Sequence, residues 1–400
     1  MTFRKNLLLV HRWTGIVLAT FLVLAGLTGS LLAFHHEIDA VLVPELHSVT
    51  PTGTMASLDE VAARIEAAHP GLVVGYFLFS AAEGSSIRAI MNTVEAAEAG
   101  RLDRDSPRPS EVYINPHSGA VLGTRNWGEV GLSRAHLVPM IYRFHMSLLL
   151  GKTGQWIMGI IAVLWMATMM VGAFLAVPRI AHLQKAFVIK WQSSRARMLF
   201  DLHRSVGLIG GVLLVVIAFT GLYMNLPQVI EPAVAAMSPF SERPASVRSA
   251  DQRRDQTWQV GWDAALATAR AAHPVDPVAG IGKIEARGYY QVRFLLPGDI
   301  MDSGTVRYFV DGRNGQLLGH FNHRSGTLGD KIRVWQFPLH SGQGFGMPGR
   351  VLVLLIGLLP PLLALSGLWL WLRRRRLRRA AMTETDDSPS STYPTTREFT

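Results

Sequence analysis

Four segments of the chain are continuously apolar. They lie at 13–34, 155–177, 205–227 and 351–372, and none contains Asp, Glu, Lys or Arg. A membrane-spanning helix needs about 20 predominantly apolar residues. The pattern therefore predicts four membrane-spanning helices. The first is expected to be retained, because its apolar run exceeds the ~7–15 residues of a signal-peptide core.

Basic residues gather beside these segments at one side. Residues 1–12 carry Lys and Arg but no acid, the loop 178–204 is strongly basic, and 373–379 reads RRRRLRR. Such loops favour the cytoplasmic side, so 35–150 and 228–348 are expected outside. This placement explains the net charge of +10 without nucleic acid as a partner. The chain has no cysteine, which excludes disulfides, Cys-ligated clusters and c-type haem attachment.

The chain is internally duplicated. HRWTGIVLATFLVLAGLTGSL at 11–31 aligns without a gap with HRSVGLIGGVLLVVIAFTGLY at 203–223, and FHMSLLLG at 144–151 aligns with LHSGQGFG at 339–346. Each outer segment has an amphipathic helix followed by a strand, a Gly-containing turn and another strand. We expect two parallel repeats related by a pseudo-two-fold axis along the membrane normal.

The fold class that follows is an all-α transmembrane four-helix bundle with two small α+β domains outside the membrane. We expect these boundaries: a first membrane helix with a cytoplasmic N-terminus at 1–38, an outer domain at 39–135, a second membrane helix at 136–178, a basic cytoplasmic loop at 179–200, a third membrane helix at 201–228, a second outer domain at 229–335, a fourth membrane helix at 336–373 and a basic, disordered cytoplasmic tail at 374–400.

Histidines and glycines share one face of two apolar segments, at 100° per residue. The stripes consist of His11, Gly15, Gly26, Gly29 and His36, and of His203, Gly207, Gly210, Gly211 and Gly221. Glycine stripes also let membrane helices pack closely, and histidines also occur at the membrane interface.

The duplication pairs His11 with His203 and His145 with His340. Two facing imidazoles can bind a haem iron from both sides, with glycine leaving clearance for the macrocycle. A zinc or iron site would need three or four clustered ligands, and a proton relay would not need glycine. The pattern therefore favours two haem groups, one per pair.

His11 and His36 are separated by 25 residues, or about 37 Å of helix. Because this exceeds a hydrocarbon core of about 30 Å, haems at the two levels would form an electron path across the membrane. His36 has Gln228 as its counterpart. His36 could replace His145 or His340 as an upper ligand, or it could line an outer substrate site, and the sequence leaves these alternatives open.

Three arginines lie close to the candidate ligands in sequence: Arg12, Arg204 and Arg143. Each could pair with a haem propionate, since guanidinium groups favour bidentate carboxylate contacts. Positive-inside charge and lipid headgroup contact explain Arg12 and Arg204 equally well.

The motifs HRWTG and LHRSVG, RFHMSL and PLHSG, and the outer AAHP and YINPHSG modules resemble the PepSY-associated transmembrane helix family over residues 1–375. The resemblance implies a multi-pass protein of the bacterial inner membrane with two periplasmic PepSY-like domains. It also implies two haem b groups, the lower held by His11 and His203 and the upper by His145 and His340.

The resemblance further implies a haem-dependent ferric-siderophore reductase. Electrons from a cytosolic reductase or a membrane quinol would reduce Fe(III) in a periplasmic siderophore or similar chelate, with the redox chemistry supplied by the cofactor. A non-redox PepSY binding or regulatory protein and a metal-chelate permease are the alternatives. The sequence does not identify the electron donor, the chelate, the haem potentials or the oligomeric state.

Overall fold

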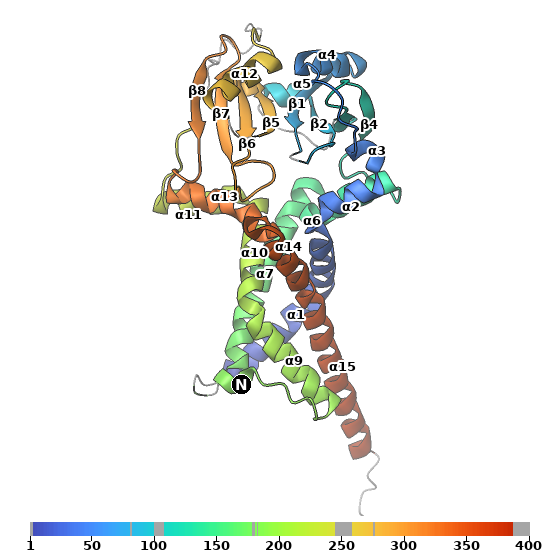
Figure 1. Cartoon of the computed structure of the whole chain (residues 1–400). Helices are drawn as coiled ribbons and strands as arrows, with labels where there is room; N and C mark the ends of the chain where they lie inside the picture. Colours follow the sequence, from blue (N-terminus) through green and yellow to red (C-terminus); the bar gives the residue numbers. More distant parts are fainter. Residues whose placement is uncertain are drawn as a thin grey trace, which may run out of the picture. The chain divides into compact units, whose positions relative to one another are not determined.

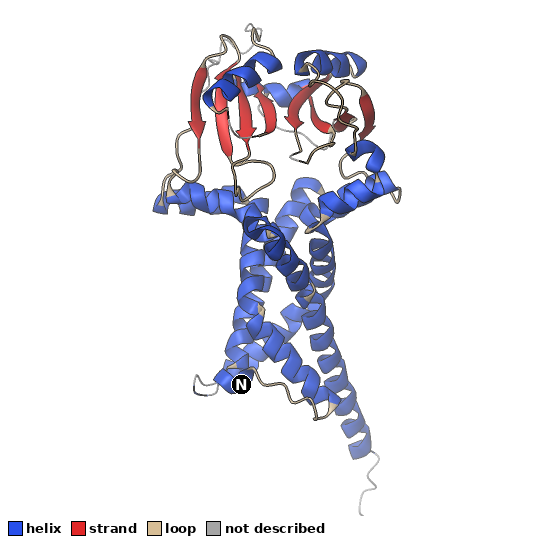
Figure 2. Cartoon of the chain, in the orientation of Figure 1, coloured by secondary structure: helices blue, strands red, loops and turns tan. Residues whose placement is uncertain are grey.

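The structure is a computed structural model that describes residues 3–80, 82–99, 108–177, 181, 183–244, 258–274 and 277–386. It divides into two compact units. Unit 1 comprises 1–23, 167–212 and 359–400, and unit 2 comprises 24–166 and 213–358. Helices occur in both units and the strands belong to unit 2 (Figures 1 and 2). The tail predicted to be disordered lies, from residue 387 onward, outside the described residues.

Three helical stretches are long and apolar enough to cross a membrane: α1 (Phe3–Leu32), α7 (Gly151–Ala176) and Gln343–Arg379. The helices α9 (Arg195–Ile209) and α10 (Gly211–Asn225) are bent by 57° and provide a fourth crossing if they form one broken span. The four apolar segments of the sequence therefore appear as three continuous helical stretches and one bent pair. Within unit 1, α9 packs against α15 (Leu359–Asp386).

The chain turns sharply before the second and fourth apolar segments. Leu148 and Leu149 are left-handed, with φ of 53° and 61°, and they separate α6 (Arg134–Ser147) from α7. Gly342, with φ of 79°, ends α13 (Leu328–Ser341) before η4 (Gln343–Phe345) and α14 (Gly346–Gly357). A left-handed residue ends a helix because it redirects the chain. His145 and His340 therefore lie on short helices of their own.

Short helices follow the first and third apolar segments in the same way. α2 (His35–Leu42) packs against α6, and α11 (Pro227–Met237) packs against α13. The remaining short helices are α3 (Pro44–His47), α5 (Val94–Glu98), α8 (Leu183–Ala186) and η3 (Glu285–Arg287).

The strands of both outer segments form one antiparallel eight-stranded sheet in the order β4-β3-β2-β1-β5-β6-β7-β8. The first segment contributes β1 (Leu72–Leu78), β2 (Ile87–Thr93), β3 (Glu111–Ile114) and β4 (Val121–Arg125), and the second contributes β5 (Val278–Ile284), β6 (Tyr289–Phe294), β7 (Val306–Asp311) and β8 (Leu317–Phe321). The sequence predicted two separate α+β domains. The pairing of β1 with β5 instead merges their sheets.

One face of this sheet is covered by α4 (Leu58–Ala68) and α12 (Trp262–Ala272). Their apolar side chains pack with alternate strand residues in a single core, which includes Ile65, Phe77, Trp262, Tyr290 and Phe294. The two helices also cap each other. Asp263 accepts a hydrogen bond from the backbone N–H of Leu58 (3.0 Å), and Asp59 accepts one from Trp262 (2.6 Å). Such caps satisfy N–H groups that a helix leaves unpaired.

Candidate functional site

A pair of half-buried histidines faces each other in unit 1. His11 of α1 and His203 of α9 have ring centroids 6.3 Å apart and ring planes at 80°. His11 Nδ1–H donates to the carbonyl of Thr168 (3.0 Å), and His203 Nδ1 is hydrogen-bonded to the Ser366 hydroxyl (2.9 Å). These contacts fix the orientation of both rings.

A second pair of the same kind lies in unit 2. His145 of α6 and His340 of α13 have ring centroids 6.2 Å apart and ring planes at 57°. The Nδ1 atoms of these rings are hydrogen-bonded to the hydroxyls of Thr28 (2.9 Å) and Thr220 (3.0 Å). His340 Nδ1 also lies 3.1 Å from the carbonyl oxygen of Ile217. The structure thus brings the four histidines together in the pairs that the sequence symmetry predicted.

Each of the four rings packs against a glycine on another helix. A Cβ atom added there would lie 2.8 Å from His11 Cε1 at Gly172, 3.2 Å from His203 Cε1 at Gly367, 3.0 Å from His145 Cε1 at Gly29 and 3.2 Å from His340 Cε1 at Gly221. The expectation was that glycine makes room for a macrocycle. At these four positions it makes room for the imidazole itself.

Not every glycine of the predicted stripes has this role. A Cβ at Gly15 would meet nothing within 4 Å, and one at Gly207 would meet only Leu363, at 3.7 Å. The two stripes are therefore partly a property of helix packing.

The hydroxyls of Thr28 and Thr220 leave a defined lone pair on the rings of His145 and His340. Thr28 donates its own hydroxyl proton to the carbonyl of Leu24 (2.7 Å), and Thr220 donates to Val216 (2.9 Å). Their oxygens then accept from the histidine Nδ1–H. With Nδ1 protonated, Nε2 carries the lone pair that binds a metal, which is the arrangement by which outer partners orient metal-binding histidines.

The spacing of both pairs fits one metal between two imidazoles. Imidazoles that bind a metal from opposite sides have centroids about 6.2 Å apart, because each metal–nitrogen bond is about 2.0 Å and the ring centre lies about 1.1 Å beyond the nitrogen. Among the described residues, no group of three or more His, Cys, Asp or Glu side chains is arranged to hold a metal ion. The pairs therefore fit a cofactor that brings its own equatorial ligands, as haem does.

The three arginines near the ligands have different surroundings. Arg12 Nε is buried without a hydrogen-bond partner, while its guanidinium lies 5.6 Å from the Trp13 ring centroid. Arg204 donates to the carbonyls of Ala186 and Val188 (both 2.9 Å) and pairs with Asp201 (3.1 Å). These contacts tie Arg204 to the basic loop, so its own surroundings favour a structural role over a propionate contact.

Arg143 and His36 both lie in unit 2, and Arg143 comes two residues before His145. The aliphatic part of Arg143 packs against Gly128. His36 lies on α2 and its ring lies against that of His35, with centroids 4.0 Å apart and ring planes tilted by 35°. Because His145 and His340 already face each other, the second pair is formed without His36.

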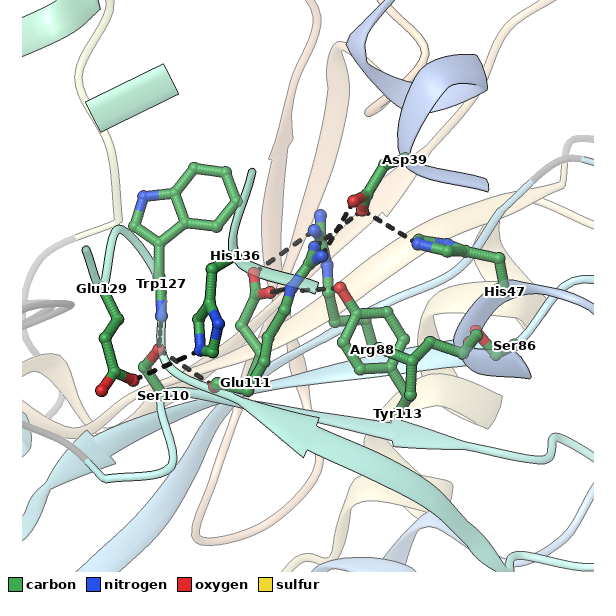
Figure 3. Close-up of polar contacts among 12 residues, drawn as sticks. Asp39, His47, Ser86, Arg88, Ser110, Glu111, Tyr113, Trp127, Glu129 and His136 are labelled. Carbon is green, nitrogen blue, oxygen red and sulfur yellow. Dashed lines mark hydrogen bonds and ion pairs between the residues drawn. The ribbon is translucent and has the colours of Figure 1, made fainter. Parts of the chain in front are cut away.

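Sequence reasoning missed a buried charged network in unit 2 (Figure 3). Arg125 of β4 is hydrogen-bonded to Asp39 of α2 (3.0 Å) and to Glu111 of β3 (2.9 Å). His47 binds the other Asp39 oxygen at 2.9 Å, and Arg88 pairs with Glu111 at 3.3 Å. The partners lie up to 86 residues apart in sequence, so no local sequence pattern predicts these contacts.

Hydrogen bonds outweigh burial in setting the pKa of Asp39 in this network. Burial alone would raise the pKa of the Asp39 carboxyl, but hydrogen bonds from His47 and Arg125 lower it to about 2. Asp39 therefore stays charged at neutral pH and anchors α2 to the sheet.

One protein family matches the chain over most of its length. The family described as PepSY-associated TM region matches residues 8–374, a range that contains all four paired histidines and every strand. No curated protein matches the chain. The apolar helices and this match identify a membrane protein. The chain is therefore a member of the PepSY-associated TM region family.

Proposed function

We propose that this protein is a di-haem membrane reductase that passes electrons to Fe(III) in a siderophore or similar chelate. The observation that carries the proposal is the geometry of the two histidine pairs, at 6.3 and 6.2 Å between centroids with every Nδ1 hydrogen-bonded. His11 and His203 would hold one haem b, and His145 and His340 the other. Bound haem iron supplies one-electron chemistry by cycling between Fe(II) and Fe(III).

The residues around the pairs have separate tasks in this proposal. The hydroxyl and carbonyl acceptors keep Nε2 directed away from the backbone, and the glycines let each ring approach a neighbouring helix. The unpartnered Arg12 Nε offers a donor to a propionate of the haem at His11. Helix α1 serves both pairs, since it carries His11 as well as Thr28 and Gly29.

The proposed reaction is balanced for electrons and protons. One quinol releases two electrons and two protons and reduces two ferric chelates, each gaining one electron to become Fe(II). A cytosolic reductase is the other class of donor. Reduction weakens binding of iron by hard oxygen ligands and so releases it. The proposal includes a four-helix arrangement of the spans in a bacterial inner membrane, with both termini cytoplasmic and the sheet in the periplasm.

The test is a visible spectrum of the protein purified in mild detergent from cells with adequate haem supply. We expect a Soret band, sharp α bands after dithionite and about two haem b per chain by pyridine haemochrome. The reduced protein should then be reoxidised by a ferric chelate in stoichiometric amounts. A colourless protein from haem-replete cells would refute the proposal and favour a non-redox binding protein. Accumulation of intact chelate by vesicles without any electron donor would favour a permease.

A further inference from the structure

Two arginines lie directly opposite each other on the face of the sheet away from α4 and α12. Arg293 of β6 and Arg307 of β7 are cross-strand partners. Their strand neighbours Val292, Phe294 and Val306 point into the core, so the arginines point to the other face. Like charges directly opposite in a sheet are destabilising. An anion bound between the two arginines would offset this repulsion.

The described part of the protein does not provide that anion. The Nε atoms of Arg293 and Arg307 are buried without a hydrogen-bond partner, and no ion pair joins either guanidinium to a described acid. Asp311, which lies on β7 like Arg307, is already paired with Arg313 (2.8 Å), and Glu231 of α11 is paired with Arg333 (2.7 Å). Burial and the charges of Arg293 and Arg243 lower the pKa of Arg307 to about 10, so it remains charged at neutral pH.

Aromatic rings hold both guanidinium groups in place. Arg293 lies 4.9 Å from the centroid of Tyr76, and Arg307 lies 5.7 Å from that of Phe321. The Tyr76 ring lies against Gly280 and Gly282 of β5, where a side chain would collide with it. A guanidinium held beside an aromatic ring offers a planar set of hydrogen-bond donors, which suits a carboxylate.

In the first half of the sheet, the position equivalent to Arg307 carries an acid whose charge is balanced by arginines. Glu111 pairs with Arg125 across β3 and β4, and Arg307 pairs with Phe321 across β7 and β8, with a register shift two residues further on in both cases. Glu111 and Arg307 are thus equivalent positions. The carboxylate of Glu111 binds Arg88 and Arg125. In the second half an arginine replaces this carboxylate, and no described acid is paired with the charges of Arg293 and Arg307.

We propose that Arg293, Arg307 and Tyr76 form a binding site for a carboxylate-bearing anion. The ligand's carboxylate supplies the negative charge that Glu111 supplies in the first half of the sheet. The identity of the ligand rests on the proposed function: it is an anionic ferric chelate with free carboxylates. The site binds such a chelate more tightly than a neutral hydroxamate chelate. Its binding weakens with rising salt because the attraction is between charges.

The test measures binding separately from reduction, by titrating the full-length protein in detergent with gallium(III) citrate, which is inert to reduction. We expect Arg293→Met and Arg307→Met each to raise the dissociation constant about tenfold or more, as for loss of a charge-assisted contact. Arg324→Met is the matched control, because Arg324 is exposed and binds only loop carbonyls. This control should bind gallium citrate like the unmodified protein.

A second variant guards against simple misfolding. Arg307→Glu restores the acid of the equivalent Glu111, so it should fold with at least the original thermal stability and yet lose gallium citrate binding. Unchanged binding by Arg307→Glu would overturn the site. Equal affinity for a neutral gallium(III) trihydroxamate would overturn the carboxylate preference. Competition only by vesicles containing phosphatidylglycerol would assign the arginines to lipid headgroups. Gallium citrate binding without reduction of ferric citrate would refute the reductase and leave the site intact.

Discussion

The two repeats of the chain agree at the histidines and differ on the sheet. Each histidine pair takes one member from each repeat, and the glycine that supports each ring recurs as well. On the sheet, Glu111 of the first repeat corresponds to Arg307 of the second. A site shared between two repeats restrains both in the same way. Glu111 has its partners Arg88 and Arg125 within the first repeat, so the equivalent position of the second repeat is free to carry a different charge and to bind a different partner.

Replacement of a paired histidine should have the largest effect on bound haem. The size of this effect should be the same for both repeats. We expect His11→Ala and His203→Ala each to lose about half of the bound haem, because either change leaves one axial position empty. His145→Ala and His340→Ala should lose the other half. The measurement is haem per chain by absorption spectroscopy. His69→Ala is the control, since His69 only caps α4 through the carbonyl of Ile65 (2.9 Å).

The expected equivalence of the two repeats fails if the two histidines of a pair differ in how much haem is lost on substitution. Retention of both haems in His11→Ala, with loss of one in His203→Ala, would show that the rings do not share a metal.

The second effect should depend strongly on the repeat. Asp39→Asn leaves Arg125, whose side chain is only 2% exposed, without one of its acids. Breaking a buried ion pair in this way costs about 3–5 kcal/mol. Arg307→Met in the second repeat removes a like-charge contact and should be neutral or slightly stabilising. Thermal unfolding followed by circular dichroism distinguishes the two, with the exposed Glu45→Gln as a control expected within about 1 kcal/mol.

The Asp39 contribution also has a defined pH dependence. The folded pKa of about 2 lies below the ordinary 3.8, so the stabilisation is complete above about pH 4 and is lost as the pH falls toward 2. Asp39→Asn should therefore lack this acid-sensitive part of the stability. Equal acid sensitivity of the variant and the unmodified protein would contradict the network.

The histidine pairs could be predicted because a gap-free repeat carries its own symmetry. When His11 aligns with His203, the pairing follows without knowledge of the fold. The merging of two small sheets into one could not be predicted, because it depends on β1 meeting β5 about 200 residues away. The helix break at Leu148 was equally hidden, since leucine rarely adopts a left-handed conformation and gives no turn signal.

A third prediction concerns the glycines that contact the histidine rings. It compares the loss of haem affinity caused by alanine in the first repeat with the loss caused in the second. Alanine at Gly172 or Gly29 of the first repeat would place Cβ 2.8 or 3.0 Å from a histidine, whereas at Gly367 or Gly221 the distance is 3.2 Å. Overpacking typically costs about 1–3 kcal/mol. We therefore expect a loss of haem affinity of about tenfold or more for the first two variants and a smaller loss for the others.

Gly15→Ala is the matched control for this series, because nothing lies within 4 Å of the added methyl group. It should retain both haems and gain a little helix stability. A loss of haem in Gly15→Ala equal to that in Gly172→Ala would mean that the glycines act through helix flexibility and not through contact with the rings.

The smallest effect should come from the hydroxyl groups, and here one site is the exception. The residue before the supporting glycine is Thr28, Thr220 or Ser366 at three rings, but Val171 at His11. A hydroxyl that accepts from Nδ1–H makes the imidazole more electron-rich, which favours Fe(III) and lowers the reduction potential. Thr28→Val should therefore raise the potential of the haem at His145 and weaken its retention by up to about tenfold, the low end for an outer partner.

Val171→Thr is the converse test, since it offers His11 the hydroxyl that the other three rings already have. We expect the potential of the haem at His11 and His203 to fall while that of the other haem stays constant in a redox titration of the α bands. A packing effect alone would alter haem content without moving one potential selectively. If both potentials stay fixed, the carbonyl of Thr168 at 3.0 Å already saturates His11 Nδ1–H, and the repeats are electronically equivalent despite the missing hydroxyl.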